Sequence, residues 1–126
     1  MAVHMDGRLA VLKDLIPKTS IDIIEGFHPL PMGDLPLDEA LSLWKDKAIW
    51  IGFPDAVYQL GTQATRERAL SLLQEAMPGD RVAIAMSTEN PVSNQNLLTL
   101  TSVLEKAYLP LSAAEIDQIA KQTSQA

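Results

Sequence analysis

His4 and Asp6 are the first residues along this chain whose side chains could do chemistry. They stand two apart at the end of a short apolar run and are followed by Gly7. On an extended strand, residues two apart point to the same side, so the imidazole and the carboxylate would lie together. Such a pair could bind a divalent metal ion or act in acid–base catalysis. The alternative is structural, with Asp6 capping a following helix and His4 hydrogen-bonded beside it.

Two further carboxylates follow apolar runs in the same way. Glu25 ends the run Asp22-Ile-Ile, and Glu89 follows the run that begins at Arg81. The predicted catalytic residues are His4, Asp6, Glu25 and Glu89. A divalent metal ion, the one cofactor that these residues suggest, would be held by His4, Asp6 and Glu89, because carboxylates and imidazole suit such ions.

The later candidates also have structural interpretations. Glu25 could accept backbone N–H groups of the adjacent loop, and the polar stretch 87–90 could be turn chemistry before a helix capped by Ser93 or Asn94. His28 lies in a loop rich in proline and glycine, where a solvated histidine is expected rather than a ligand. Asp55 follows a proline and is a second-tier candidate that could fix a turn.

Four apolar runs predict four strands, each followed by a stretch with helical periodicity. Strands are expected near 1–6, 21–25, 48–53 and 81–87, and helices near 8–16, 37–45, 62–76, 95–107 and 111–124. Continuously apolar strands suit a parallel sheet that is covered on both faces. Crossovers between parallel strands are right-handed, so the helices would lie outside a curved sheet. The polar residues after the strands would then meet at the carboxyl edge, where such folds carry their active sites.

The predicted fold class is therefore α/β, with residues 1–126 forming one domain that is half of a (β/α)8 TIM barrel. A closed barrel needs about eight strands and roughly 250 residues, so four strands leave two unpaired edges. We expect a homodimer in which the first and fourth strands pair with the fourth and first strands of the partner. That pairing would bring Glu89 toward His4 and Asp6 across the interface. A doubly wound, flavodoxin-like sheet is the competing architecture.

Composition excludes several classes of function. The 126 residues include 10 basic and 16 acidic side chains, and a net charge of −6 argues against a nucleic-acid partner. The absence of cysteine excludes disulfides, thiolate nucleophiles and cysteine-bound metals. No apolar run approaches the roughly 18 residues needed to span a bilayer, and no targeting segment is evident, so a soluble, cytoplasmic protein is expected. The glycines form no nucleotide-binding motif.

Four segments occur in a characteristic order: HMDG, DIIEGFHPLPMGD, LDEALSLWKDKAIWIGFP and PGDRVAIAMSTENPVSNQNLLTLTSVLEKA. In this order the chain resembles the C-terminal half of the uroporphyrinogen decarboxylase superfamily, over roughly residues 2–108. The resemblance implies a (β/α)8 barrel and either a lyase that decarboxylates a porphyrin-type substrate or a cobalamin-dependent methyltransferase. It also implies a small-molecule pocket at the carboxyl ends of the strands.

The resemblance extends only partly to the functional residues of the family. In the methyltransferase branch a His-x-Cys pair and a later cysteine bind zinc; His4 matches the histidine, but Asp6 stands at the first cysteine and Thr88 or Glu89 near the second. In the decarboxylase branch the substrate-binding arginines and aspartate belong to the N-terminal half of the barrel, and the late histidine has no counterpart here. The expected function is a uroporphyrinogen decarboxylase-like protein, either a decarboxylase or a methyltransferase relative. The alternative is a non-catalytic half-barrel fragment or assembly module.

Overall fold

The structure of the protein, a computed structural model, describes residues 1–86 and 88–124, which form two compact units. The first unit comprises residues 1–54 and 81–86, and the second comprises residues 55–80 and 88–124. The first unit contains the strands β1 (Ala2–His4), β2 (Ile23–Phe27), β3 (Ala48–Gly52) and β4 (Val82–Ala85), the 3-10 turns η1 (Ala10–Leu12) and η2 (Ile16–Lys18), and the helix α1 (Leu37–Leu43). The second contains the helices α2 (Asp55–Gln59), α3 (Thr62–Ala76), α4 (Asn94–Leu104) and α5 (Ala113–Thr123).

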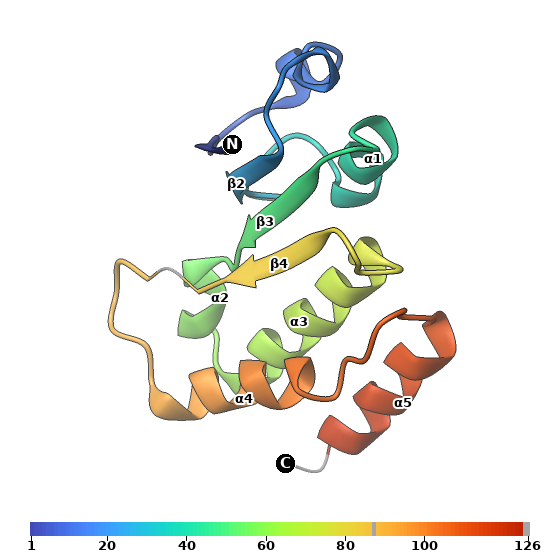
Figure 1. Ribbon diagram of the computed structural model, residues 1–126. Helices are drawn as coiled ribbons and strands as arrows, with labels where there is room; N and C mark the ends of the chain where they lie inside the picture. The colour runs from blue at the N-terminus through green and yellow to red at the C-terminus, as the bar shows by residue number, and fades with distance from the viewer. Residues whose placement is uncertain (87, 125–126) are drawn as a thin grey trace. The chain divides into compact units, whose positions relative to one another are not determined.

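The four strands form one parallel sheet in the order β1-β2-β3-β4, as the arrows in Figure 1 show. This confirms the predicted α/β class with a four-stranded parallel sheet. The register aligns His4 with Glu25, Glu25 with Trp50, and Trp50 with Ala83. These four residues therefore form one row across the whole sheet, on a single face.

The two faces of the sheet differ in character. Ile24, Ile49 and Ile51 point to one face and are fully buried. Side chains alternate between faces along a strand, so the row that contains Glu25 and Trp50 lies on the opposite face. Trp50 is 39% exposed there, which is high for a tryptophan inside a sheet. We call this side, with the row from His4 to Ala83, the open face.

Helix α1 supplies much of the core of the first unit. Leu37, Ala40 and Trp44 are fully buried. The Trp44 ring meets the Phe27 ring edge to face, with 5.9 Å between centroids. This spacing and geometry are favourable for aromatic pairs. The prediction of a helix at 37–45 is confirmed, although the helix ends at Leu43.

The predicted helix over 8–16 is wrong, because the segment forms only the two short turns η1 and η2. Pro17 lies inside η2 and has no N–H, so an α-helical hydrogen bond from residue 17 to the Lys13 carbonyl cannot form. The Lys13 carbonyl instead accepts a hydrogen bond of 2.9 Å from Trp44 Nε1.

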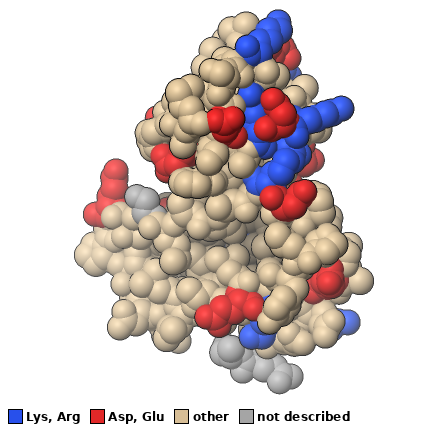
Figure 2. All heavy atoms as spheres, viewed as in Figure 1, with Lys and Arg blue, Asp and Glu red and all other residues tan. Residues whose placement is uncertain are grey.

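Two cations tie the elements of the first unit together. Arg81 donates to the carbonyls of Leu41, Trp44 and Lys47 at 2.8 to 3.1 Å. Lys47 is only 2% exposed, and its ammonium donates to two carbonyls in the segment before β2. Figure 2 shows Lys and Arg side chains gathering on the first unit with Asp and Glu side chains among them. Arg81 and Lys47 therefore bind backbone carbonyls and connect the segments that carry them.

The second unit is helical, and its helix ends follow the sequence signals. Helix α3 spans Thr62–Ala76, as predicted. Ser93 caps α4 by accepting the Asn96 N–H, and Ser112 forms a capping box with Glu115 at the start of α5. The loop expected after Pro54 contains the short helix α2. In the described part of the chain, no helix has both the length and the hydropathy to cross a bilayer.

Candidate functional site

The site is built on the pairing of β1 with β2. His4 ends β1 and is the register partner of Glu25 on β2. The His4 Nδ1–H donates a hydrogen bond to Glu25 Oε2, and the two groups form an ion pair when the ring is protonated. A carboxylate is only an acceptor, so this contact assigns a proton to Nδ1 and leaves Nε2 outside the hydrogen bond with Glu25.

Gly26 makes room for the His4 ring. A Cβ atom at position 26 would lie 2.6 Å from His4 Cε1 and 2.7 Å from Nδ1, much too close for any side chain. Gly26 also has a φ of +75°, which strongly favours glycine. The strand register shifts at this point, between Glu25 and Phe27, so the glycine forms an irregularity beside the imidazole. Gly26 therefore leaves the space that the His4 ring occupies.

The electrostatic surroundings of His4 favour its charged form. The hydrogen bond that His4 donates to Glu25 is the largest influence raising the pKa of the His4 imidazolium, and the Glu25 charge adds to it. Partial desolvation lowers the pKa slightly, whereas the Asp6 charge raises it. The side chains of His4 and Glu25 are 65% and 33% exposed, so the pair lies open to solvent. A histidine held in this way can exchange a proton with a ligand on the open face.

Asp6 lies near His4 but does not cap a helix. Its Oδ2 atom is 3.9 Å from His4 Nε2, beyond hydrogen-bond distance. The turn that follows begins after Leu9 without a side-chain cap, and the Ala10 N–H is bound by Asp34 instead. The structure thus brings together His4, Glu25 and Asp6, three of the four predicted site residues.

Glu89, the fourth, belongs to the second unit and is exposed. Its neighbour Asn90 donates to Asp55 Oδ2 at 2.5 Å, so Asn90 and Asp55 fix the loop before α4. Ser87, part of the same polar stretch, lies outside the described residues. The approach of Glu89 to His4 in a dimer stays a prediction.

The residues present do not fit a thiolate zinc site, because the chain has no cysteine. Within residues 1–86 and 88–124, no three His, Asp or Glu side chains are arranged to hold a metal ion. His4 Nδ1 is already bonded to Glu25. Binding of a metal ion by His4, Asp6 and Glu89 therefore stays a prediction.

His28 differs from the solvated loop histidine that the sequence favours. The residue is half-buried, and its Nδ1 atom is buried without a hydrogen-bond partner. Its ring lies over Gly52, the last residue of β3. Gly52 is distant in sequence and belongs to no glycine motif, so no local signal identifies this contact.

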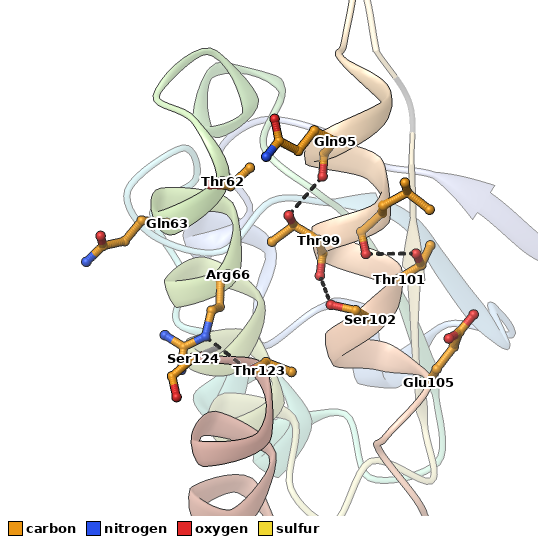
Figure 3. Close-up of a pocket in the computed structure, with 11 residues that line it drawn as sticks. Thr62, Gln63, Arg66, Gln95, Thr99, Thr101, Ser102, Glu105, Thr123 and Ser124 are labelled. Atoms are coloured by element: carbon orange, nitrogen blue, oxygen red, sulfur yellow. Dashed lines mark hydrogen bonds between the residues drawn. The ribbon is translucent and has the colours of Figure 1, made fainter. Parts of the chain in front are cut away.

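A polar groove lies among the helices of the second unit (Figure 3). It has a volume of about 710 Å³ and is lined by α3, α4 and the end of α5. Its hydroxyl groups are bonded internally: Thr99 donates to Gln95 O and Ser102 to Thr99 O, each at 2.8 Å. The guanidinium of Arg66 donates to Thr123 and to the Ala120 carbonyl. These contacts stabilise the helices and give the groove a structural explanation.

Comparisons with protein-family models, with curated proteins and with solved structures found no match for this chain.

Proposed function

We propose that this chain is a decarboxylase-like enzyme, related to the uroporphyrinogen decarboxylase superfamily, in which His4 is the proton donor. The observation that carries the proposal is the His4–Glu25 pair, seated on Gly26 at the carboxyl end of a parallel sheet. This edge is where α/β barrels carry their catalytic groups. The order of the sequence segments supports the same assignment.

The proposed reaction uses the two nitrogens of His4 differently. The C–C bond to the carboxylate of the substrate breaks heterolytically, CO2 leaves, and the electron pair stays on carbon. The Nε2–H of the His4 imidazolium then gives its proton to that carbon, leaving a neutral imidazole whose Nδ1–H still donates to Glu25. R–COO⁻ and one proton become R–H and CO2, and solvent returns a proton to Nε2.

The substrate must delocalise the electron pair that CO2 leaves behind. Carboxylic acids with a neighbouring carbonyl group or an electron-rich ring meet this need. Trp50, the register neighbour of Glu25, is 39% exposed on the same face. Its ring offers a flat apolar surface to a planar substrate.

Methyl transfer is less well supported by the residues present. A zinc-bound thiolate route needs cysteine ligands, and the chain has none. The hydrogen bond to Glu25 also engages one of the two nitrogens of His4. A proton donor needs only the other nitrogen, so the decarboxylase branch is the one that we propose.

We propose further that the sheet is half of a barrel that a second copy completes. Strands β1 and β4 are at the two ends of the sheet, so each has one unpaired edge among the described strands. Unpaired edges favour association with further strands. Two copies related by a two-fold axis would supply eight strands and enclose both open faces. The exposed His4 would then lie inside a cavity.

The decisive experiment measures decarboxylation of oxaloacetate, a β-keto acid used as a probe, in the presence of EDTA. We expect the chain to exceed the buffer rate, and His4→Gln to lower its rate about 100-fold, the size of effect common for a general acid. Glu25→Gln should also lower the rate, because the ring loses its charged partner. Glu39→Gln is the matched control, since Glu39 has similar exposure and pairs with Lys13 at 2.9 Å, away from His4. Equal rates for the chain and His4→Gln would contradict the proposal.

A non-catalytic assembly module is the second candidate. The observation that favours it is that Asp6 stands where the methyltransferase branch has a zinc-binding cysteine, and the late histidine of the decarboxylase branch has no counterpart in this sequence. Under this hypothesis the chain would form the two-fold assembly, yet oxaloacetate would decay at the buffer rate with every variant.

A further inference from the structure

The His28 ring lies on the open face of the sheet. A Cβ atom at Gly52 would come within 2.5 Å of His28 Cε1 and 3.2 Å of both ring nitrogens. Gly52 is two residues after Trp50 on β3, and residues two apart on a strand share a face. The ring is therefore placed over the same face as Trp50, at the carboxyl end of β3.

The loop that carries His28 is closely packed on itself. A Cβ atom at Gly33 would lie only 1.9 Å from the His28 carbonyl oxygen, so only glycine fits at position 33. The Gly33 N–H also donates to the Pro29 carbonyl at 3.1 Å. These contacts fix the backbone at His28, and the ring position is a property of the fold.

The two nitrogens of His28 are in different environments. Nδ1 is buried and has no hydrogen-bond partner in the structure. An unpaired N–H in a buried position is rarer than an unpaired acceptor, so the proton is best placed on Nε2. His28 thus offers an Nε2–H donor for which a ligand can supply the acceptor.

Each of the two histidine rings lies over a glycine of a neighbouring strand. His4 lies over Gly26 of β2, and His28 lies over Gly52 of β3. Adjacent strands are about 4.8 Å apart, so Gly26 and Gly52, over which the two rings lie, are separated by roughly 5–7 Å. A small molecule with two acceptor groups can span this distance, whereas a single acceptor reaches only one ring.

We infer that His28 is a second binding residue of this face, whose Nε2–H holds an acceptor oxygen of a ligand seated beside the His4–Glu25 pair. The preferred ligand then carries two acceptor groups, as dicarboxylates and keto acids do. This inference rests on the proposed function for the role of His4. His28 positions the ligand and takes no part in the proton transfer.

The test compares malonate, which has two carboxylates, with acetate, which has one, by NMR titration of the histidine ring signals at one fixed pH. With only two histidines in the chain, each ring can be assigned from His4→Gln and His28→Gln. We expect malonate to bind about tenfold more tightly than acetate, the usual effect of one added hydrogen bond. In His28→Leu, whose side chain has no N–H donor, the two ligands should bind equally.

Gly52→Ala tests whether the position of the His28 ring over Gly52 matters for binding, because the added methyl group must displace that ring. It should abolish the preference for malonate, and in a His28→Ala background the same change should have no effect on binding. Circular dichroism verifies that Gly52→Ala is folded, and His28→Leu leaves Gly52 unchanged if it is not. A malonate preference unchanged in His28→Leu would overturn the inference. If ligands shift the His28 signals while those of His4 do not respond, the His28 site stands and the proposed function fails.

Discussion

At the scale of residues, the position and charge of the His4 ring depend on two neighbours of opposite kinds. Glu25 provides a charged acceptor for Nδ1, and Gly26 provides space because it has no side chain. The first favours the charged form of the ring, and the second leaves the space that the ring occupies. The two contributions can therefore be separated by substitution.

Replacing Glu25 by Gln should lower the pKa of His4. The reason is that the hydrogen bond donated to Glu25, together with the charge of that carboxylate, is the main cause of the raised pKa of His4. Measurement of the His4 ring shifts against pH gives the value directly, and Glu39→Gln should leave it unchanged. A His4 pKa that stays the same in Glu25→Gln would show that the carboxylate does not control the ring.

The same pair should make stability depend on pH. A histidine with a raised folded-state pKa stabilises the fold below its unfolded pKa, and that contribution is lost as pH rises through the folded pKa. The free energy of unfolding should therefore differ between the chain and Glu25→Gln at mildly acidic pH, and the difference should shrink at alkaline pH. Denaturant unfolding at several pH values measures this, and a difference that grows with pH would contradict the assignment.

At the scale of elements, the sequence predicts most where the signals are local. Helix α3 follows Gly61 and stops before Pro78 and Gly79, and its predicted bounds match the structure. The segment 8–16 also has helical spacing of leucines, yet it forms only short turns, and its Lys13 carbonyl binds the distant Trp44 indole. A contact across 31 residues cannot be inferred from periodicity.

The candidate site likewise combines a contact that the sequence predicts with contacts that only the folded sheet defines. The pairing of His4 with Asp6 follows from their spacing, and the structure places them 3.9 Å apart. The hydrogen bond to Glu25 depends on the register of β1 against β2, which only the folded sheet defines. The position of the His28 ring over Gly52 depends on how the loop after β2 packs against β3, and the sequence gives no sign of this contact.

Arg81 provides a prediction at the same scale. It binds the carbonyls of Leu41, Trp44 and Lys47, which include groups at the end of α1 that the helix leaves unpaired. Arg81→Met keeps the length of the side chain but removes every donor. We expect a loss of about 2–3 kcal/mol in the free energy of unfolding, since several acceptors lose a charged partner.

Denaturant unfolding measures this loss, and Lys45→Met is its control. Lys45 is an exposed cation between α1 and β3, and its replacement should change stability by less than about 0.5 kcal/mol. Equal stabilities for Arg81→Met and Lys45→Met would mean that the carbonyls find other partners.

At the scale of the whole molecule, the open face and the unpaired strand edges both leave groups of the sheet exposed to solvent. The face presents Trp50 and the His4–Glu25 pair to solvent, and the edges present backbone groups of β1 and β4. Closing a barrel with a second copy would satisfy the edges and enclose the face in a single step. Assembly and catalysis are therefore coupled in the proposed function, and they can be tested together.

The backbone of β1 offers a specific way to test the assembly. Met5 N–H donates to Glu25 O at 2.8 Å, and Met1 O accepts from Ile23 N–H at 3.2 Å, so these residues of β1 bond toward β2. Backbone groups alternate along a strand, and the Ala2 N–H therefore points to the unpaired edge. Proline is tolerated at such an edge position, where it removes a donor without breaking the ladder.

Light scattering after size exclusion should give the chain a molar mass of twice 13.8 kDa. Ala2→Pro should shift it to the monomer, because the edge loses a hydrogen bond at the proposed interface, whereas Ala2→Ser keeps the N–H and should remain dimeric. If the barrel encloses the site, Ala2→Pro should also lose the oxaloacetate activity although His4 and Glu25 are untouched. If the chain is monomeric and still decarboxylates oxaloacetate, catalysis does not depend on assembly. The active form would then be a single sheet with an open face. A dimer that persists unchanged in Ala2→Pro would place the interface elsewhere than at this edge.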